Sequence, residues 1–60
     1  MRNSYITKMG KDTIREVYEN PNNFNEGEKT QAYNDAKVLN SIGTISNNEM
    51  ILIEKKLNNN

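Results

Sequence analysis

The sequence predicts an all-α mini-domain of two or three helices, built on an antiparallel helical hairpin over residues 28–57. Three features indicate this fold: a glycine that ends one helix, a capping motif three residues later, and apolar residues at helical spacing on both sides. Residues 1–60 make a single small domain, with residues 1–4 and 58–60 expected to be disordered. Its apolar share of 33% is below the roughly 45–50% of typical globular chains. The core is therefore marginal, and tight helix packing or a partner has to add stability.

The first helix is expected over about Thr13–Glu19, with Asp12 as its N-cap. It ends at Asn20–Pro21, because a proline pushes the preceding residue out of helical geometry. Gly10 interrupts the apolar pattern before this helix. The segment Tyr5–Met9 therefore fits either an initial turn of the same helix or a short strand.

A polar loop over residues 22–27 follows, with Phe24 as its one aromatic residue. We expect Phe24 to fold back over the hairpin core, and an exposed anchor for a partner is the alternative. The second helix should begin near Glu26 or Glu28, whose negative charges suit the positive end of the helix dipole.

The chain is expected to turn at Gly43, between the second and third helices. Glycine adopts the left-handed conformation past a helix end at the lowest cost. The segment Ser46–Glu49 has the spacing of a capping box, in which the serine hydroxyl accepts from the amide three residues on and the glutamate reaches back to the serine amide. Ile45 and Met50 stand where a hydrophobic staple places its pair. Together with Ile45, Ile42 is expected to close this end of the hairpin.

The third helix carries more apolar residues than one neighbouring helix can cover. Its main face has apolar residues at steps of three and four: Met50, Ile53 and Leu57. This face should meet the apolar side of the second helix, formed by Ala32, Ala36 and Leu39. Ile51 and Leu52 widen the apolar surface further. Either a second chain covers the remainder, or the first helix does so with Ile14, Val17 and Tyr18.

Catalysis is not expected from this composition. The chain has no cysteine and no histidine, which excludes a zinc site built on those residues, and no metal or other cofactor is predicted. Glu49 and Glu54 lie five residues apart and do not share a helix face, and Asp35 is interpreted as a solvated charge. A chain this short does not readily build a water-excluded cleft. We therefore predict that the protein is not an enzyme.

Hydropathy and residue usage bear on location and origin. No apolar run approaches the roughly 18 residues of a membrane span, and the first residues lack the apolar core of a signal peptide. These patterns favour a cytoplasmic protein without membrane contact. Heavy use of Asn, Lys and Ile together is typical of AT-rich coding DNA. It indicates a low-GC bacterium, or a phage or plasmid that lives in one.

The charges are unevenly distributed, although the formal net charge is zero. The first fifteen residues carry a net charge of +3, and residues 16–35 carry −4. The basic segment supports an alternative function as a DNA-binding accessory protein, through Arg2, Lys8, Lys11 and Arg15. Ordinary solvated helix faces explain the same charges, and the apolar middle of the third helix does not suit a polar DNA groove. Nucleic-acid binding is therefore the less favoured prediction.

One further pattern combines a leucine-bearing helix, a glycine, an aliphatic residue with serine, and a glutamate followed by a large apolar residue. The residues are Leu39, Gly43, Ile45, Ser46, Glu49, Met50 and Leu57. The pattern resembles the short C-terminal helical hairpin called SHOCT, and it covers about a third of the chain. It departs from that family where Met50 replaces the usual aromatic residue and where Ile53 or Glu54 replaces a lysine. The resemblance implies a small oligomerisation or partner-binding module without catalysis.

In general character the chain also resembles small accessory proteins of phages and mobile elements, which often bind a host protein. The function predicted from the sequence is protein–protein interaction through burial of an apolar helix face. The chain would act as a homo-oligomer, or as a modulator or inhibitor of a larger host protein. The side chains predicted to contact the partner are Tyr18, Phe24, Tyr33, Met50, Ile51, Leu52 and Ile53.

Overall fold

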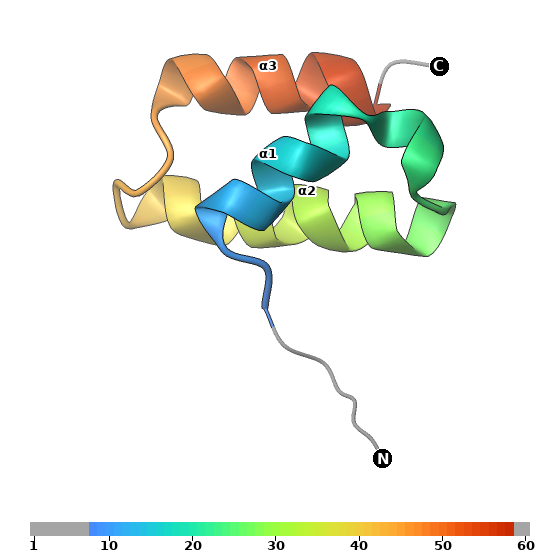
Figure 1. Cartoon of the computed structure of the whole chain (residues 1–60). Coiled ribbons are helices and arrows are strands. Elements are labelled where there is room, and N and C mark those ends of the chain that lie inside the picture. The colour runs from blue at the N-terminus through green and yellow to red at the C-terminus, as the bar shows by residue number, and fades with distance from the viewer. Residues whose placement is uncertain (1–7, 59–60) are drawn as a thin grey trace.

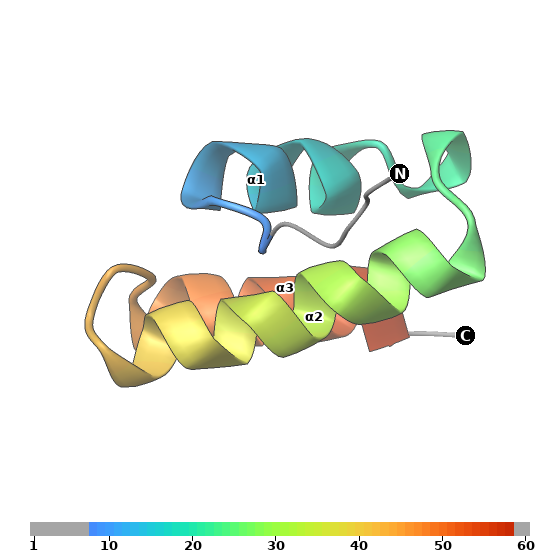
Figure 2. The same cartoon turned by 90° about the horizontal axis from the view of Figure 1, so that it is seen from below.

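A computed structural model describes residues 8–58 of the chain, and within that range every regular element is helical. The elements in order are α1 (Lys11–Glu19), the 3-10 helix η1 (Pro21–Asn23), α2 (Glu26–Ser41) and α3 (Asn47–Asn58). The predicted all-α class is confirmed. Helices α2 and α3 run antiparallel and form the expected hairpin, and α1 crosses one face of it (Figure 1). Figure 2 shows α1 as a second layer over the hairpin.

Helix α1 begins two residues earlier than the sequence predicts. Its N-cap is Gly10, which supplies no side-chain hydrogen bond, and the Ile14 amide donates to the Gly10 carbonyl at 3.0 Å. Asp12 is therefore not the cap. It lies in the first turn, where a negative charge still favours the helix dipole. In the segment Tyr5–Met9, the two described residues have no regular secondary structure, and the rest lies outside the described residues, as do residues 1–4.

The connection to α2 is shorter and more ordered than the predicted loop over residues 22–27. Pro21 is the first residue of η1, and the fixed φ angle of proline suits the first position of a helix. Helix α2 then begins at Glu26 with a reciprocal capping box that was not predicted. The Glu28 amide donates to the Asn25 side chain at 2.8 Å, and the Asn25 amide donates to the Glu28 carboxylate at 2.9 Å.

The closed end of the hairpin turns at Gly43, as predicted. Gly43 has φ of +87°, and the hydrogen bonds around it form a Schellman motif. The Thr44 amide donates to the Leu39 carbonyl at 2.9 Å, and the Gly43 amide donates to the Asn40 carbonyl at 3.2 Å. The prediction that Ile42 closes this end is wrong, because Ile42 is the C-cap and its side chain is 68% exposed.

The core is formed by all three α-helices and by Ile45, which lies two residues before α3. Its fully or nearly fully buried side chains are Ile14, Val17, Tyr18, Ala32, Ala36, Ile45, Met50 and Ile53. The α1 residues thus cover the inward face of α3, so a single chain closes its own core. The side chain of Phe24, the residue that follows η1, packs against this core as predicted, and Leu57 does so from the end of α3.

Helix α3 starts at its predicted cap and ends at Asn58. The Glu49 amide donates to the Ser46 hydroxyl at 3.1 Å, which is one half of the predicted capping box. No bond returns from the Ser46 amide to the Glu49 carboxylate among the described residues. Asn58 is helical, which shortens the predicted disordered tail by one residue, and residues 59–60 lie outside the described residues.

Candidate partner-binding surface

The structure separates the side chains predicted to contact a partner according to their exposure. Tyr18, Met50 and Ile53 belong to the core, with exposed fractions between 0 and 8%. These three residues hold the helices together and are not available on the surface of this fold, which corrects their predicted role. Phe24 and Tyr33 are partly buried and pack against the core.

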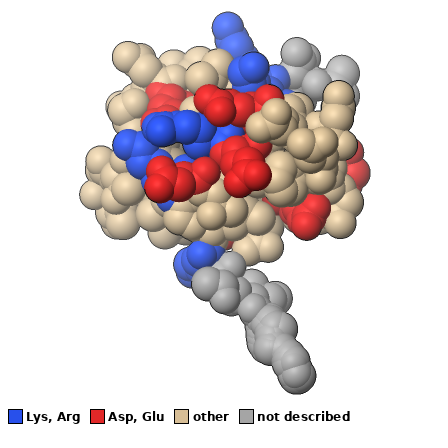
Figure 3. All heavy atoms as spheres, viewed as in Figure 1, with Lys and Arg blue, Asp and Glu red and all other residues tan. Residues whose placement is uncertain are grey.

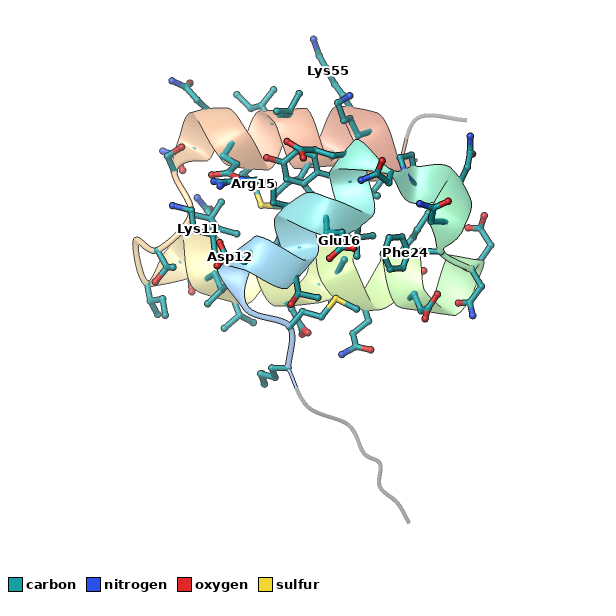
Figure 4. All side chains as sticks on the ribbon, viewed as in Figure 1. Lys11, Asp12, Arg15, Glu16, Phe24 and Lys55 are labelled. Atoms are coloured by element: carbon teal, nitrogen blue, oxygen red, sulfur yellow. The ribbon has the colours of Figure 1, made fainter. Side chains whose placement is uncertain are left out.

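Ile51 and Leu52 remain on the surface, with exposed fractions of 54% and 40%. Each helical residue is rotated by about 100° from the last, so the direction between these two side chains points away from the buried face of α3. Asn48 and Lys55 lie on the same side, one turn before and one turn after. Figure 4 shows Lys55 projecting outward from α3, away from α1 and α2. We call Asn48, Ile51, Leu52 and Lys55 the α3 outer face.

A second exposed apolar pair, which was not predicted, lies at the C-terminal end of α2. Val38 is 43% exposed, and Ile42 follows it by one turn with 68% exposed. Their spacing of four residues, which places two side chains on the same side of a helix, was the signal in the sequence that could have predicted this pair. Val38 is three residues after Asp35, so it lies on the side of α2 that meets the chain entering α1. This pair is therefore separate from the α3 outer face.

A polar link joins α1 to Glu49 of α3, the glutamate of the predicted capping box. The Tyr18 hydroxyl donates to the Glu49 carboxylate at 2.8 Å, and the Arg15 guanidinium forms an ion pair with the same carboxylate oxygen at 3.4 Å. Burial raises the pKa of Tyr18, and the hydrogen bond to Glu49 raises it further. Glu49 thus binds α1 across the fold, which explains why its side chain does not complete the local capping box.

Asp35 is a structural residue, and its interpretation as a solvated charge is wrong. Its carboxylate accepts from the Met9 amide at 2.9 Å and from the Gln31 side chain at 3.4 Å. The first of these bonds holds the chain that leads into α1 against α2. Sequence spacing carries no signal for it, because 26 residues separate the two partners.

Tyr33 marks the side of α2 that faces α3. Its hydroxyl donates to the Glu54 carboxylate of α3 at 3.1 Å, and the Lys37 ammonium lies 5.0 Å from the centre of its ring. The hydroxyl therefore contributes a contact between α2 and α3 of the same chain, and the ring contributes a cation–π pair. This position accounts for the part of its surface that is buried.

The exposed side of α1 carries charges of both signs. Lys11, Asp12, Arg15 and Glu16 all come from α1 (Figure 4). Figure 3 shows basic and acidic side chains interleaved over the middle of this face. Arg2 lies outside the described residues. The residues proposed for DNA binding thus do not form a uniformly basic surface on α1, since acidic side chains separate them.

Residues 8–58 contain no pocket, and no group of three or more acidic side chains in this range is placed to hold a metal ion. None of its helices is long and apolar enough to cross a membrane. Comparison of the chain with family models, with curated proteins and with solved structures gives no match. The resemblance to SHOCT hairpins stays a prediction.

Proposed function

We propose that the chain is a small, non-enzymatic protein–protein interaction module that binds a larger protein through the α3 outer face. The observation that carries this proposal is that Ile51 and Leu52 remain exposed after the core has closed. Neither residue is needed to complete the fold. Adjacent large aliphatic side chains on the outside of a helix are suited to contact with another apolar surface.

The shape of the α3 outer face favours a partner with a groove. Two side chains on a convex helix present far less than the roughly 800 Å² per partner of a standard interface. A larger protein can reach that area by surrounding α3, in the manner of a helix laid in a groove. Lys55 and Lys56, both exposed at one end of this face, favour acidic residues on that side of the partner.

The biological role that fits such a module is modulation or inhibition of a host protein in the cytoplasm. The small size of the chain and its residue usage support this role, because phage and mobile-element accessory proteins share both features. A homo-oligomer is the alternative, and it would use the same two side chains. The two partners are distinguished by mass.

The first measurement is sedimentation equilibrium of the purified chain at micromolar concentration, with helix content followed by circular dichroism. We expect a helical monomer. The wild-type chain is then used to capture proteins from a low-GC bacterial lysate, in parallel with Ile51→Asp/Leu52→Asp. The matched control is Ile42→Asp, which places the same charge on the other exposed apolar pair.

A captured protein that is retained by the wild type and by the control, and lost by the double variant, supports the proposal. The double variant must keep the helix content of the wild type. Self-association that the double variant abolishes would assign the face to a second copy. If the double variant captures the same proteins as the wild type, the α3 outer face is not the binding site.

A further inference from the structure

We propose that α1 is an exchangeable helix, and that the hairpin face it covers accepts the α1 of a second copy. Exchange would give a dimer in which each hairpin binds the partner chain's α1, with residues 20–24 as the hinge. The hairpin inner face is lined by Ala32, Ala36, Ile45, Met50 and Ile53. This surface is distinct from the α3 outer face, and the inference does not depend on the proposed function.

The hairpin has its own local stabilisation at each helix end. Asn25 and Glu28 cap the start of α2 reciprocally, and the Schellman motif at Gly43 satisfies its last carbonyls. The Ser46 hydroxyl caps the start of α3. The Asn40 side chain also donates to the Ile45 carbonyl at 3.0 Å and to the Asn47 side chain at 2.9 Å. None of these bonds involves α1.

Helix α1 has weaker local support, although its C-cap Asn20 donates to the Glu16 carbonyl from its amide at 3.0 Å and from its side chain at 3.4 Å. It has nine residues, its N-cap Gly10 gives no side-chain hydrogen bond, and its last turn has no basic residue to favour the dipole. An isolated helix shorter than about 12–15 residues is marginal in water. Helix α1 therefore depends on docking, through Ile14, Val17 and Tyr18. The same three side chains of another copy would fit the same face.

The polar contacts of α1 define one docked position. The Tyr18 hydroxyl and the Arg15 guanidinium both bind the Glu49 carboxylate, and the Met9 amide binds Asp35. These bonds hold α1 to both helices of the hairpin. They can form equally between two chains, because each joins a residue before the hinge to a residue after it.

The hinge lies at one end of the molecule, where η1 joins α1 to α2 (Figure 2). Its own backbone bonds are local, from the Asn23 amide to the Asn20 carbonyl at 2.9 Å and from the Phe24 amide to the Pro21 carbonyl at 3.2 Å. When these bonds open and Phe24 leaves the core, the five hinge residues can extend to about 17 Å. This reach carries α1 away from its own hairpin, as domain swapping requires.

At low protein concentration, α1 docks on the hairpin of its own chain in preference to that of a second chain. A short linker gives α1 an effective concentration on the order of millimolar at its own hairpin. An experiment on exchange must therefore disable docking within the chain and leave docking between chains intact. Two full-length variants achieve this. Val17→Asp disables α1 but keeps the hairpin inner face, and Ile53→Asp disables the hairpin inner face but keeps α1.

The two variants are measured separately and as an equimolar mixture, by circular dichroism and sedimentation equilibrium. Protein concentrations extend up to about 1 mM. In neither variant can α1 dock on the hairpin of its own chain, so docking between chains has no competitor. We expect Val17→Asp alone to lose the helix signal of α1, and Ile53→Asp alone to lose much of the wild-type helix signal. The mixture should regain helix signal beyond the sum of its parts and sediment as two chains, since α1 of one variant docks on the hairpin of the other. The control is a mixture of Ile14→Asp with Val17→Asp, where both chains have a disabled α1.

Three results would overturn the proposal. The first is a mixture whose spectrum equals the sum of the separate spectra over the whole concentration range. The second is recovery in the control mixture, which would mean that hairpins pair with one another without α1. The third is a Val17→Asp chain that forms helical oligomers by itself, which has the same meaning.

Discussion

Two isoleucines on α3 offer a sharp test of where the core ends. Ile53 has no exposed surface, whereas Ile51 exposes 54% of its own. Replacement by alanine removes three carbon atoms, worth about 0.8 kcal/mol each when fully buried. Ile53→Ala thus loses about 2.4 kcal/mol of burial, and the cavity left behind raises the cost to about 3 kcal/mol.

The same truncation at Ile51 costs much less. Less than half of that side chain is buried, so Ile51→Ala loses about 1 kcal/mol of burial. Both variants gain the few tenths of a kcal/mol by which alanine exceeds isoleucine in helix propensity. Because this gain is common to both, the difference of about 2 kcal/mol between the variants reports the lost burial together with the cavity left at Ile53.

The difference is large for a chain of this size. A 60-residue domain is stable by roughly 3–9 kcal/mol, at about 0.05–0.15 kcal/mol per residue. The assay is urea unfolding followed by circular dichroism at several protein concentrations. With a slope near 1 kcal/mol per molar urea, the two midpoints should differ by about 2 M. Equal midpoints at low protein concentration would refute the assignment of Ile53 to the core and Ile51 to the surface.

Three further predictions concern the polar link and the glycines. The raised pKa of Tyr18 means that the folded state holds its proton longer than the unfolded state. The stability that this raised pKa contributes is therefore fully present below the unfolded pKa near 10 and is lost as pH rises through the folded pKa. Urea midpoints of the wild type should fall over this pH range. Tyr18→Phe should not show this additional fall. Arg15→Ala should leave the urea midpoint close to that of the wild type, because the Arg15 side chain is 43% exposed and its pair with Glu49 is screened by solvent. A midpoint lowered as far as that of Ile53→Ala would contradict this. Gly43→Ala should destabilise the fold by about 1 kcal/mol, because the φ of Gly43 is +87°. Gly27→Ala, in the first turn of α2, should stabilise it by about 0.5 kcal/mol. Thermal melts in which both variants shift the melting temperature in the same direction would refute the distinction.

The helix ends were largely predictable from the sequence, because they depend on residues within a few positions of one another. Gly43 and Ser46 were identified correctly, since a positive φ and a hydroxyl cap are local requirements. Asn25 has the same kind of signal, an Asn three residues before Glu28, and its capping box was missed. The start of α1 was misplaced, because Gly10 carries no side chain that marks a cap.

Periodicity predicted that Met50 and Ile53 face α2, and both are buried, but it left open whether anything covers Ile51 and Leu52. Met50, Ile51, Leu52 and Ile53 are consecutive apolar residues, and a helix places them on more than one face. Helix α1 packs on the core side of the hairpin, so Ile51 and Leu52 stay exposed. The roles of Glu49 and Asp35 also depend on α1, since each binds a residue that is distant in sequence.

The sequence by itself determined the helical class, the hairpin and its turn, because capping, turn geometry and helical spacing act over a few residues. Only the tertiary structure decided that α1 completes the core and that Ile51 and Leu52 stay exposed. The physical reason is that burial depends on which elements meet in space. Contacts between α1 and the hairpin join residues more than twenty positions apart, and no local pattern encodes them.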